Sequence, residues 1–119
     1  MKIAISCSGN NMDAQADPRF GRAAGFIIYD TDGGKFEYID NKQNLQAMQG
    51  AGIQAAKTVV DAGAKAVITG HCGPKAFMTL KSAGIAIYTG ASGPVSGVVE
   101  KFKRGEFSEA HDADVQGHW

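Results

Sequence analysis

The chain has 119 residues, close to the commonest size of a single domain, and 44% of them are hydrophobic and 20% charged, as in globular proteins. Lysine plus arginine and aspartate plus glutamate number 12 each, which excludes the strong basic field of a nucleic-acid-binding protein. No apolar run has the length of a membrane span or a signal peptide, and two cysteines are too few for a disulfide framework. These features predict one cytoplasmic domain that contacts neither membrane nor nucleic acid.

The first predicted element is a buried strand over residues 2–7, KIAISC, an apolar run bounded by serine and glycine. Residues 8–22 are polar, lack periodicity and contain an Asp-Pro step, so we interpret them as a long loop. Residues 26–30 and 35–40 flank the sequence TDGG, which is typical of a β-hairpin with glycines at its turn.

The second half of the chain alternates helices and strands. Buried strands are predicted over residues 65–69 and 85–89. Each predicted helix precedes one of these strands or follows it. Gly63 and Gly84 stand where helices commonly end, and Pro74 stands where a helix commonly begins. The three apolar helical faces are Ile53, Ala56, Val59 and Val60; Phe77, Leu80 and Ala83; and Val95, Val98, Val99 and Phe102. On the last helix, Glu100 and Arg104 are spaced for an ion pair.

The element order β-β-β-α-β-α-β-α predicts a three-layer α/β sandwich with a five-stranded mixed sheet and helices on both faces. Right-handed crossovers make the strands at 2–7, 65–69 and 85–89 parallel, and the hairpin adds antiparallel strands. The first strand is expected beside the 65–69 strand, with the hairpin on one side and the last strand on the other. Residues 1–107 then form a single binding domain, and the aperiodic residues 108–119 are predicted to be a flexible tail.

Connections leave in opposite directions where the first strand meets the 65–69 strand, and ligands of open α/β sheets bind at such a switch point. Three loops are expected there, CSGNN, GHCGP and TGASGP. The second loop carries His71 and Cys72 side by side, which raises the question of a nucleophile or a metal site.

A phosphatase-type nucleophile needs an arginine six residues after its cysteine. Met78 stands at that place after Cys72, and Asp13 stands there after Cys7, so covalent catalysis is disfavoured and we expect no enzymatic activity. A closed zinc site is disfavoured as well, because structural zinc needs four ligands in paired short spacings and His71 and Cys72 are adjacent. The plainer interpretation is that they are ordinary turn residues.

An anion site has better support. Gly70, Gly73 and Pro74 place free N–H groups at a helix start, TGASGP offers a second one, and Arg19 and Arg22 lie in the preceding loop. The alternative is that the glycines only form sharp turns and the arginines are solvated. Neither GxxxxGK[ST] nor GxGxxG follows a strand, so we expect no nucleotide cofactor.

Two stretches, DPRFGRAAGFIIYD (17–30) and VITGHCGPKAFMTLKSAGIAIYTGASGPV (67–95), resemble the dinitrogenase iron–molybdenum cofactor-binding family, which includes NifX-type accessory proteins and the C-terminal domain of NifB. The resemblance extends from Met1 to about Phe107. It implies an RNase H-like fold and the binding, storage or delivery of an anionic metal–sulfur cluster, without catalysis. Small free-standing chains of this pattern are associated with a molybdenum–copper sulfide cluster held without covalent protein ligands.

The resemblance also implies a set of site residues. Those that match its motifs are Phe20, Gly21, Arg22, Gly70, Gly73, Pro74 and Gly90. We add Ser8, Met12 and Arg19 from the 8–22 loop itself, Arg19 as a cation of the anion site and Met12 as an apolar side chain to lie against sulfide. His71 and Cys72 occupy variable positions of the glycine-proline turn, and their soft donors make them candidate ligands of copper.

We therefore expect non-covalent cluster binding in a crevice at the carboxyl ends of the parallel strands, with residues 8–22 as a lid. The alternative is a regulatory or protein-interaction module that senses a metal or small anion through the same crevice. A partner protein that donates or receives the cluster is implied. The exposed hairpin strand allows either a monomer or a weak homodimer.

Overall fold

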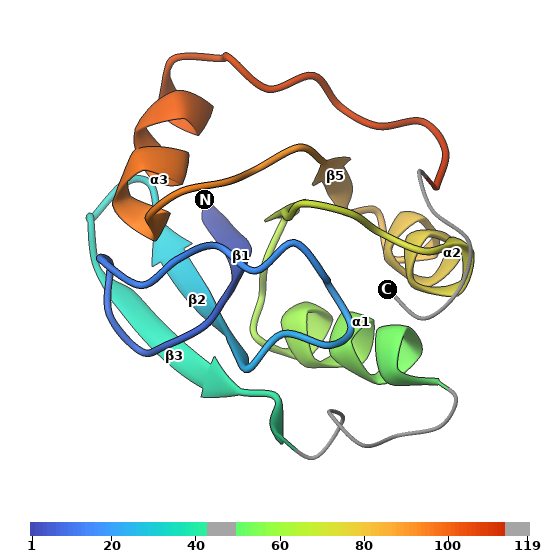
Figure 1. Ribbon diagram of the computed structural model, residues 1–119. Helices are drawn as coiled ribbons and strands as arrows, with labels where there is room; N and C mark the ends of the chain where they lie inside the picture. The colour runs from blue at the N-terminus through green and yellow to red at the C-terminus, as the bar shows by residue number, and fades with distance from the viewer. Residues whose placement is uncertain (43–49, 114–119) are drawn as a thin grey trace.

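The computed structural model describes residues 1–42 and 50–113 (Figure 1). Within this part the elements are β1 (Lys2–Cys7), β2 (Gly25–Asp30), β3 (Phe36–Asp40), α1 (Ala51–Asp61), β4 (Ala66–Ile68), α2 (Pro74–Ser82), β5 (Ala86–Tyr88) and α3 (Val95–Lys103). The predicted element order is confirmed. None of the helices described has the length and hydropathy needed to cross a bilayer.

The five strands form one sheet in the order β3-β2-β1-β4-β5. β1 pairs with β2 antiparallel and with β4 parallel, and β4 pairs with β5 parallel. The register places Ile5 of β1 beside Ile27 of β2 and Ile68 of β4. The predicted switch point between β1 and β4 is therefore present.

The side chains of the sheet alternate between two apolar cores. Ala4, Phe26 and Val67 face α1 and α2, whereas Ile5 and Ile27 face α3. Helices thus cover both faces, which confirms the predicted three-layer sandwich. We call the two sides the α1/α2 face and the α3 face.

The buried stripe of α1 is rotated relative to the prediction. Ala51, Ala55, Ala56 and Val59 are buried, whereas Ile53 is only partly so. Small side chains suit this position because α1 approaches α2 closely: a Cβ added at Gly52 would lie 3.0 Å from that of Ala76 in α2. Residues 43–49, which we interpreted as the lead-in to this helix, lie outside the described residues.

The predicted ion pair between Glu100 and Arg104 is wrong. The side chain of Arg104 instead pairs with Glu106, just beyond the end of α3. The backbone N–H of Arg104 donates to the carbonyl of Glu100, so these two residues are joined through the backbone and not through their side chains.

The segment after α3 returns to the free edge of β5. The N–H of Ala110 donates to the carbonyl of Ile87 at 2.7 Å, and Glu109 forms a bridge with Tyr88 and an ion pair of 3.1 Å with Lys81. The start of the segment 108–119 is thus attached to the sheet. The flexibility of that segment stays a prediction, and residues 114–119, including His118, lie outside the described residues.

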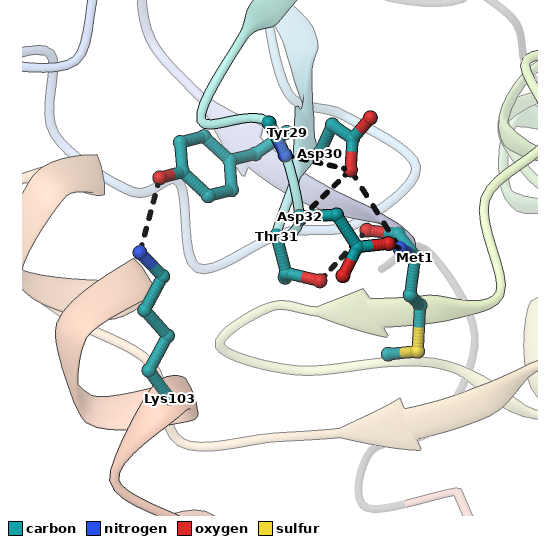
Figure 2. A network of polar contacts seen from close by, with 7 residues as sticks. Met1, Tyr29, Asp30, Thr31, Asp32 and Lys103 are labelled. Atoms are coloured by element: carbon teal, nitrogen blue, oxygen red, sulfur yellow. Dashed lines mark hydrogen bonds and ion pairs between the residues drawn. The ribbon is translucent and has the colours of Figure 1, made fainter.

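The amino end of β1 carries a cluster of exposed polar contacts (Figure 2). The N-terminal ammonium lies 2.7 Å from a carboxylate oxygen of Asp32 and 3.6 Å from one of Asp30. On the α3 face, Nζ of Lys103 donates to the hydroxyl of Tyr29 at 3.2 Å and lies 5.3 Å from the centre of its ring. These contacts join the hairpin turn to the chain terminus and to the end of α3.

Candidate functional site

The loop between β1 and β2 folds back across the carboxyl ends of the sheet. Ala16 forms a bridge with Cys7, and the N–H of Asp17 donates to the carbonyl of Ser6 at 2.8 Å. The N–H of Ser8, a predicted site residue that is exposed, donates to the carbonyl of Gln15 at 3.0 Å. Residues 8–16 thus form a closed loop whose two ends are held together next to β1.

The same loop pairs with the turn between β4 and α2. The N–H of His71 donates to the carbonyl of Pro18 at 2.7 Å, and the N–H of Phe20 donates to the carbonyl of His71 at 3.3 Å. Arg19 and His71 are therefore the partners of a parallel bridge. This bridge joins the GHCGP turn directly to the loop that precedes the FGR motif. Its two partners are 52 positions apart in the sequence (71 minus 19).

This pairing decides which side chains face outward. Partners in a bridge carry their side chains on the same side, and neighbours along the chain alternate. The side chain of Arg19 is 51% exposed and His71 is partly exposed, whereas Phe20 and Cys72 are both 0% exposed in the core of the α1/α2 face. The adjacent histidine and cysteine consequently point to opposite sides.

Phe20 and Cys72 occupy core positions in this arrangement. The ring of Phe20 packs at 5.3 Å, centre to centre, on that of Phe26. The sulfur of Cys72 lies 3.7 Å from the carbonyl of Gly73, a long contact for a weak donor. Neither side chain reaches solvent, so the position of Cys72 gives no support to direct metal ligation, and Phe20 does not border an open surface.

The third loop closes on the other two and occupies the start of α3. Gly90, which has a φ of +85°, donates its N–H to the carbonyl of Gly70 at 2.9 Å. The first amides of α3 are also used, because Val95 donates to Ala14 at 2.9 Å and Ser96 donates to Met12 at 2.8 Å. The expectation of a second anion-accepting helix start at TGASGP is therefore wrong: the chain's own carbonyls cap it. The side chain of Met12 packs against the core of the α3 face.

The start of α2 is built differently. Gly73 is buried as the N-cap residue, Pro74 is exposed at the first helical position, and no side chain caps the helix. The first helical bond runs from the N–H of Phe77 to the carbonyl of Gly73, so the amides of Lys75 and Ala76 precede the internal hydrogen bonds of the helix. Neither α1 nor α2 has an acidic residue in its first turn, and the two starts touch at Gly52. This leaves the dipoles of both starts uncompensated by carboxylates.

At two of the predicted glycines, another part of the backbone lies too close to leave room for a side chain. A Cβ at Gly70 would lie 2.5 Å from the Cα of Pro18, and one at Gly21 would lie 2.8 Å from the backbone nitrogen of Gly52. Gly70 therefore lets the β1–β2 loop lie on the β4–α2 turn. Gly21 lets the same loop lie on the start of α1.

Basic side chains lie on the β1–β2 loop and around the start of α2. Arg19, His71 and Lys75 are at least partly exposed, and Arg22 is half-buried. The carboxylate of Asp17 is turned towards its own loop, where one oxygen accepts the N–H of Arg19 at 2.8 Å and lies 3.5 Å from its Nε. The guanidinium of Arg19 is partly neutralised by this contact.

The described residues offer little to a metal held by side chains. No three His, Cys, Asp or Glu side chains within residues 1–42 and 50–113 gather closely enough to hold an ion. Burial raises the pKa of the Cys7 thiol to about 11, so this thiol stays protonated at neutral pH and is a poor ligand or nucleophile. His111, on the attached tail, is exposed.

Sequence reasoning missed three side chains that hold this region together. Among the described residues, the fully buried polar side chains are Ser6, Asn41 and Thr69. The hydroxyl of Ser6 donates to the carbonyl of Asp17 at 2.8 Å and lies 2.7 Å from that of Thr69. Ser6 and Thr69 have a signal in the sequence, because each is a polar residue at the carboxyl end of an otherwise apolar strand. Asn41 has none, because it follows the largely polar edge strand β3.

The fold defines a three-layer α/β domain whose loops meet at the carboxyl edge of a mixed sheet, and comparison with known proteins identifies its family. Residues 1–105 match the family described as dinitrogenase iron-molybdenum cofactor, and the chain belongs to it. The resemblance predicted from the FGR and glycine-proline motifs is thereby confirmed.

Three relatives cover almost the whole chain. The apo form of the orange protein from Desulfovibrio gigas is 37% identical, with a TM-score of 0.94 and 96% of each chain covered. A candidate NifB protein from Thermotoga, solved by NMR, is 31% identical, with a TM-score of 0.84 and 98% of each chain covered. An uncharacterized protein of Methanocaldococcus jannaschii is 29% identical over 114 residues, which make up 92% of this chain and 91% of the relative.

Proposed function

We propose that this protein binds, stores or delivers an anionic metal–sulfur cluster without a catalytic step of its own, and that the cargo is a molybdenum–copper sulfide cluster. The family and the similarity to the orange protein support a cluster as cargo. The bridge between Arg19 and His71 is the observation that supports the proposed location of the cargo. It brings a loop cation and an imidazole to the same outer surface, beside the start of α2.

The electrostatics of this surface suit a compact multiple anion. A thiometallate cluster carries its negative charge on sulfide, which accepts hydrogen bonds from amides and guanidinium groups. The starts of α1 and α2 meet at Gly52 and Ala76, and each helix start contributes about 0.3–1 kcal/mol of attraction to an anion near its first turn. Arg19 and Lys75 add exposed cations. Together, the two helix starts and the cations favour an anion over a neutral ligand at the carboxyl edge of the sheet.

Binding in this proposal is non-covalent. Cys72 points into the core and Cys7 is buried with a raised pKa, so neither supplies a thiolate at the surface. His71 is the soft donor on the outer side, and it is the residue we assign to copper if one protein ligand is used. Ser8 and Met12 lie on the same loop and do not ligate in this proposal, and the side chain of Met12 packs against the core of the α3 face.

At the switch point where we expected a crevice, residues 15–20 of the β1–β2 loop lie along β1 and the β4–α2 turn. The cargo would therefore rest on the outer side of this closed loop. We further propose that a cytoplasmic partner protein donates or receives the cluster. The exposed edge strand β3, where Phe36 is 44% exposed, favours the alternative function as a protein-interaction module that senses a metal or anion.

Anaerobic titration of the apo protein with tetrathiomolybdate and copper(I) tests the proposal, with visible absorption and metal analysis after gel filtration as readouts. We expect wild-type protein to retain molybdenum, copper and sulfide together. Arg19→Ala and His71→Ala should each weaken retention about tenfold, the effect of losing one charge-assisted hydrogen bond. Arg104→Ala, which removes the same charge at the far end of α3, should bind normally.

Two outcomes would change the proposal. A wild-type protein that retains neither metal is not a carrier of this cluster. A folded Cys72→Ala variant that has lost the cluster would require the core to open and a thiolate bond to form, contrary to non-covalent binding.

A further inference from the structure

The buried polar side chains of the described residues all serve one loop. The hydroxyl of Ser6 holds it at the carbonyl of Asp17, and the hydroxyl of Thr69 contacts that of Ser6, on the side of β1 and β4. Asn41, at the end of the edge strand β3, holds it on the opposite side. No buried side-chain nitrogen or oxygen within the described residues lacks a partner, so these bonds form a satisfied network.

Asn41 makes three donor bonds to this loop. Its side-chain nitrogen donates to the carbonyl of Gly21 at 3.2 Å and to that of Ala23 at 3.0 Å. Its backbone N–H donates to the carbonyl of Ala24 at 2.9 Å. The two side-chain bonds hold the residues immediately before and after Arg22, the cation of the FGR motif.

An apolar side chain could fill the same space with no requirement for partners, whereas a buried amide is costly unless it is bonded. What distinguishes an asparagine here is that both protons of its NH₂ group are used on carbonyls that flank one residue. Gly21 is held from its other side by the start of α1, where a Cβ would meet the nitrogen of Gly52. The backbone around Arg22 is thus fixed between a buried amide and a helix start.

We propose that Asn41 is a positioning residue that fixes the backbone on both sides of Arg22 and so presents this cation to the anionic cargo. The effect of Asn41 on cargo binding rests on the proposed function. Its anchoring of the backbone around Arg22 concerns the apo protein alone. A loop that is already ordered binds its ligand without a further loss of backbone entropy, so removing the anchor weakens binding even where the fold survives.

Asn41→Asp is the sharpest variant, because it keeps the shape and replaces the NH₂ group, which makes both donor bonds, by an oxygen that faces the two carbonyls. The carboxyl group would be buried among carbonyls, so its pKa should rise and its protonated form should regain one donor bond as the pH falls. We expect faster amide exchange at residues 21–24 of the apo variant at neutral pH, with partial recovery in mild acid. Asn41→Ser, which keeps one hydroxyl donor, provides a second variant should the carboxylate prevent folding.

Val98→Ala is the matched control, since Val98 is fully buried in the core of the α3 face, whereas Phe20 of the FGR motif belongs to the core of the α1/α2 face. It should lower global stability without changing exchange at residues 21–24. In cluster titrations at neutral pH, Asn41→Asp should bind about tenfold more weakly than Val98→Ala, which corresponds to roughly one lost hydrogen bond.

The outcomes separate the two proposals. If wild-type protein takes up no cluster, the proposed function fails, and exchange at residues 21–24 still decides whether Asn41 anchors the loop. If wild type binds and both Asn41 variants match Val98→Ala in exchange and affinity, Asn41 is only part of the fold and the inference is overturned. An exchange defect that does not recover in acid would overturn the donor-bond explanation.

Discussion

The two ends of the sheet are held together by different forces. At the carboxyl end, the β1–β2 loop is joined to the other two loops by backbone hydrogen bonds and by buried hydroxyl and amide groups. At the amino end, exposed side chains make the contacts, such as the ammonium of Met1 with Asp32, whose side chain is 86% exposed (Figure 2). Buried hydrogen bonds are costly to break, whereas exposed ion pairs contribute about 0–1 kcal/mol each. Substitutions at the carboxyl end should therefore have the larger effects.

Gly70→Ala is expected to have the largest effect. The new Cβ would lie 2.5 Å from the Cα of Pro18, and backbone cannot move aside cheaply. Overpacking of this kind costs about 1–3 kcal/mol, and each kcal/mol lowers the Tm of a domain this size by roughly 4 °C or more. Thermal unfolding followed by circular dichroism measures the change.

Gly97→Ala is the matched control on α3. Nothing lies within 4 Å of a Cβ at this exposed helical position, so the same substitution should stabilise the protein by about 0.5–1 kcal/mol. Equal losses of stability in the two variants would mean that the contact at Pro18 is not what makes Gly70 necessary.

The sequence could predict the sheet because its apolar runs, turn glycines and right-handed crossovers leave few topologies open. It could also predict that GHCGP reaches the carboxyl edge. It could not tell His71 from Cys72, because their opposite orientations come from pairing with Arg19, a contact across 52 positions (71 minus 19). The role of Asn41 was hidden for the same reason, since nothing local marks its bonds to Gly21 and Ala23.

The starts of α2 and α3 sharpen the comparison within the carboxyl end. They look alike in the sequence, each a glycine-rich turn that ends in proline, yet the amides of Val95 and Ser96 in α3 already donate to loop carbonyls. We expect the amide resonances of Lys75 and Ala76 to shift, and their exchange to slow, when the apo protein binds the cluster. Those of Val95 and Ser96 should change little. NMR spectra during titration provide the measurement, and larger shifts at α3 would place the cargo on the α3 face.

The smallest effect is expected at the amino end, from the ammonium of Met1. Its hydrogen bond to Asp32 raises its pKa above the ordinary value of 8.0. A group whose pKa is raised by folding stabilises the protein fully below its unfolded pKa and loses that contribution as the pH rises through the folded pKa. Stability should therefore fall slightly between neutral pH and about pH 9.5, below the ordinary range of tyrosine and lysine. The fall should be weaker in high salt, because both partners are exposed.

Asp32→Asn removes this partner and should flatten the decline in Tm over that range. Asp61→Asn, at the exposed last residue of α1, makes the same change of charge away from the terminus and should leave the decline as it is in the wild type. A decline that persists unchanged in Asp32→Asn would assign the titration to another group. A decline as large as the loss from Gly70→Ala would show that exposed charges hold the amino end as firmly as buried hydrogen bonds hold the carboxyl end, which would overturn the contrast between the two ends.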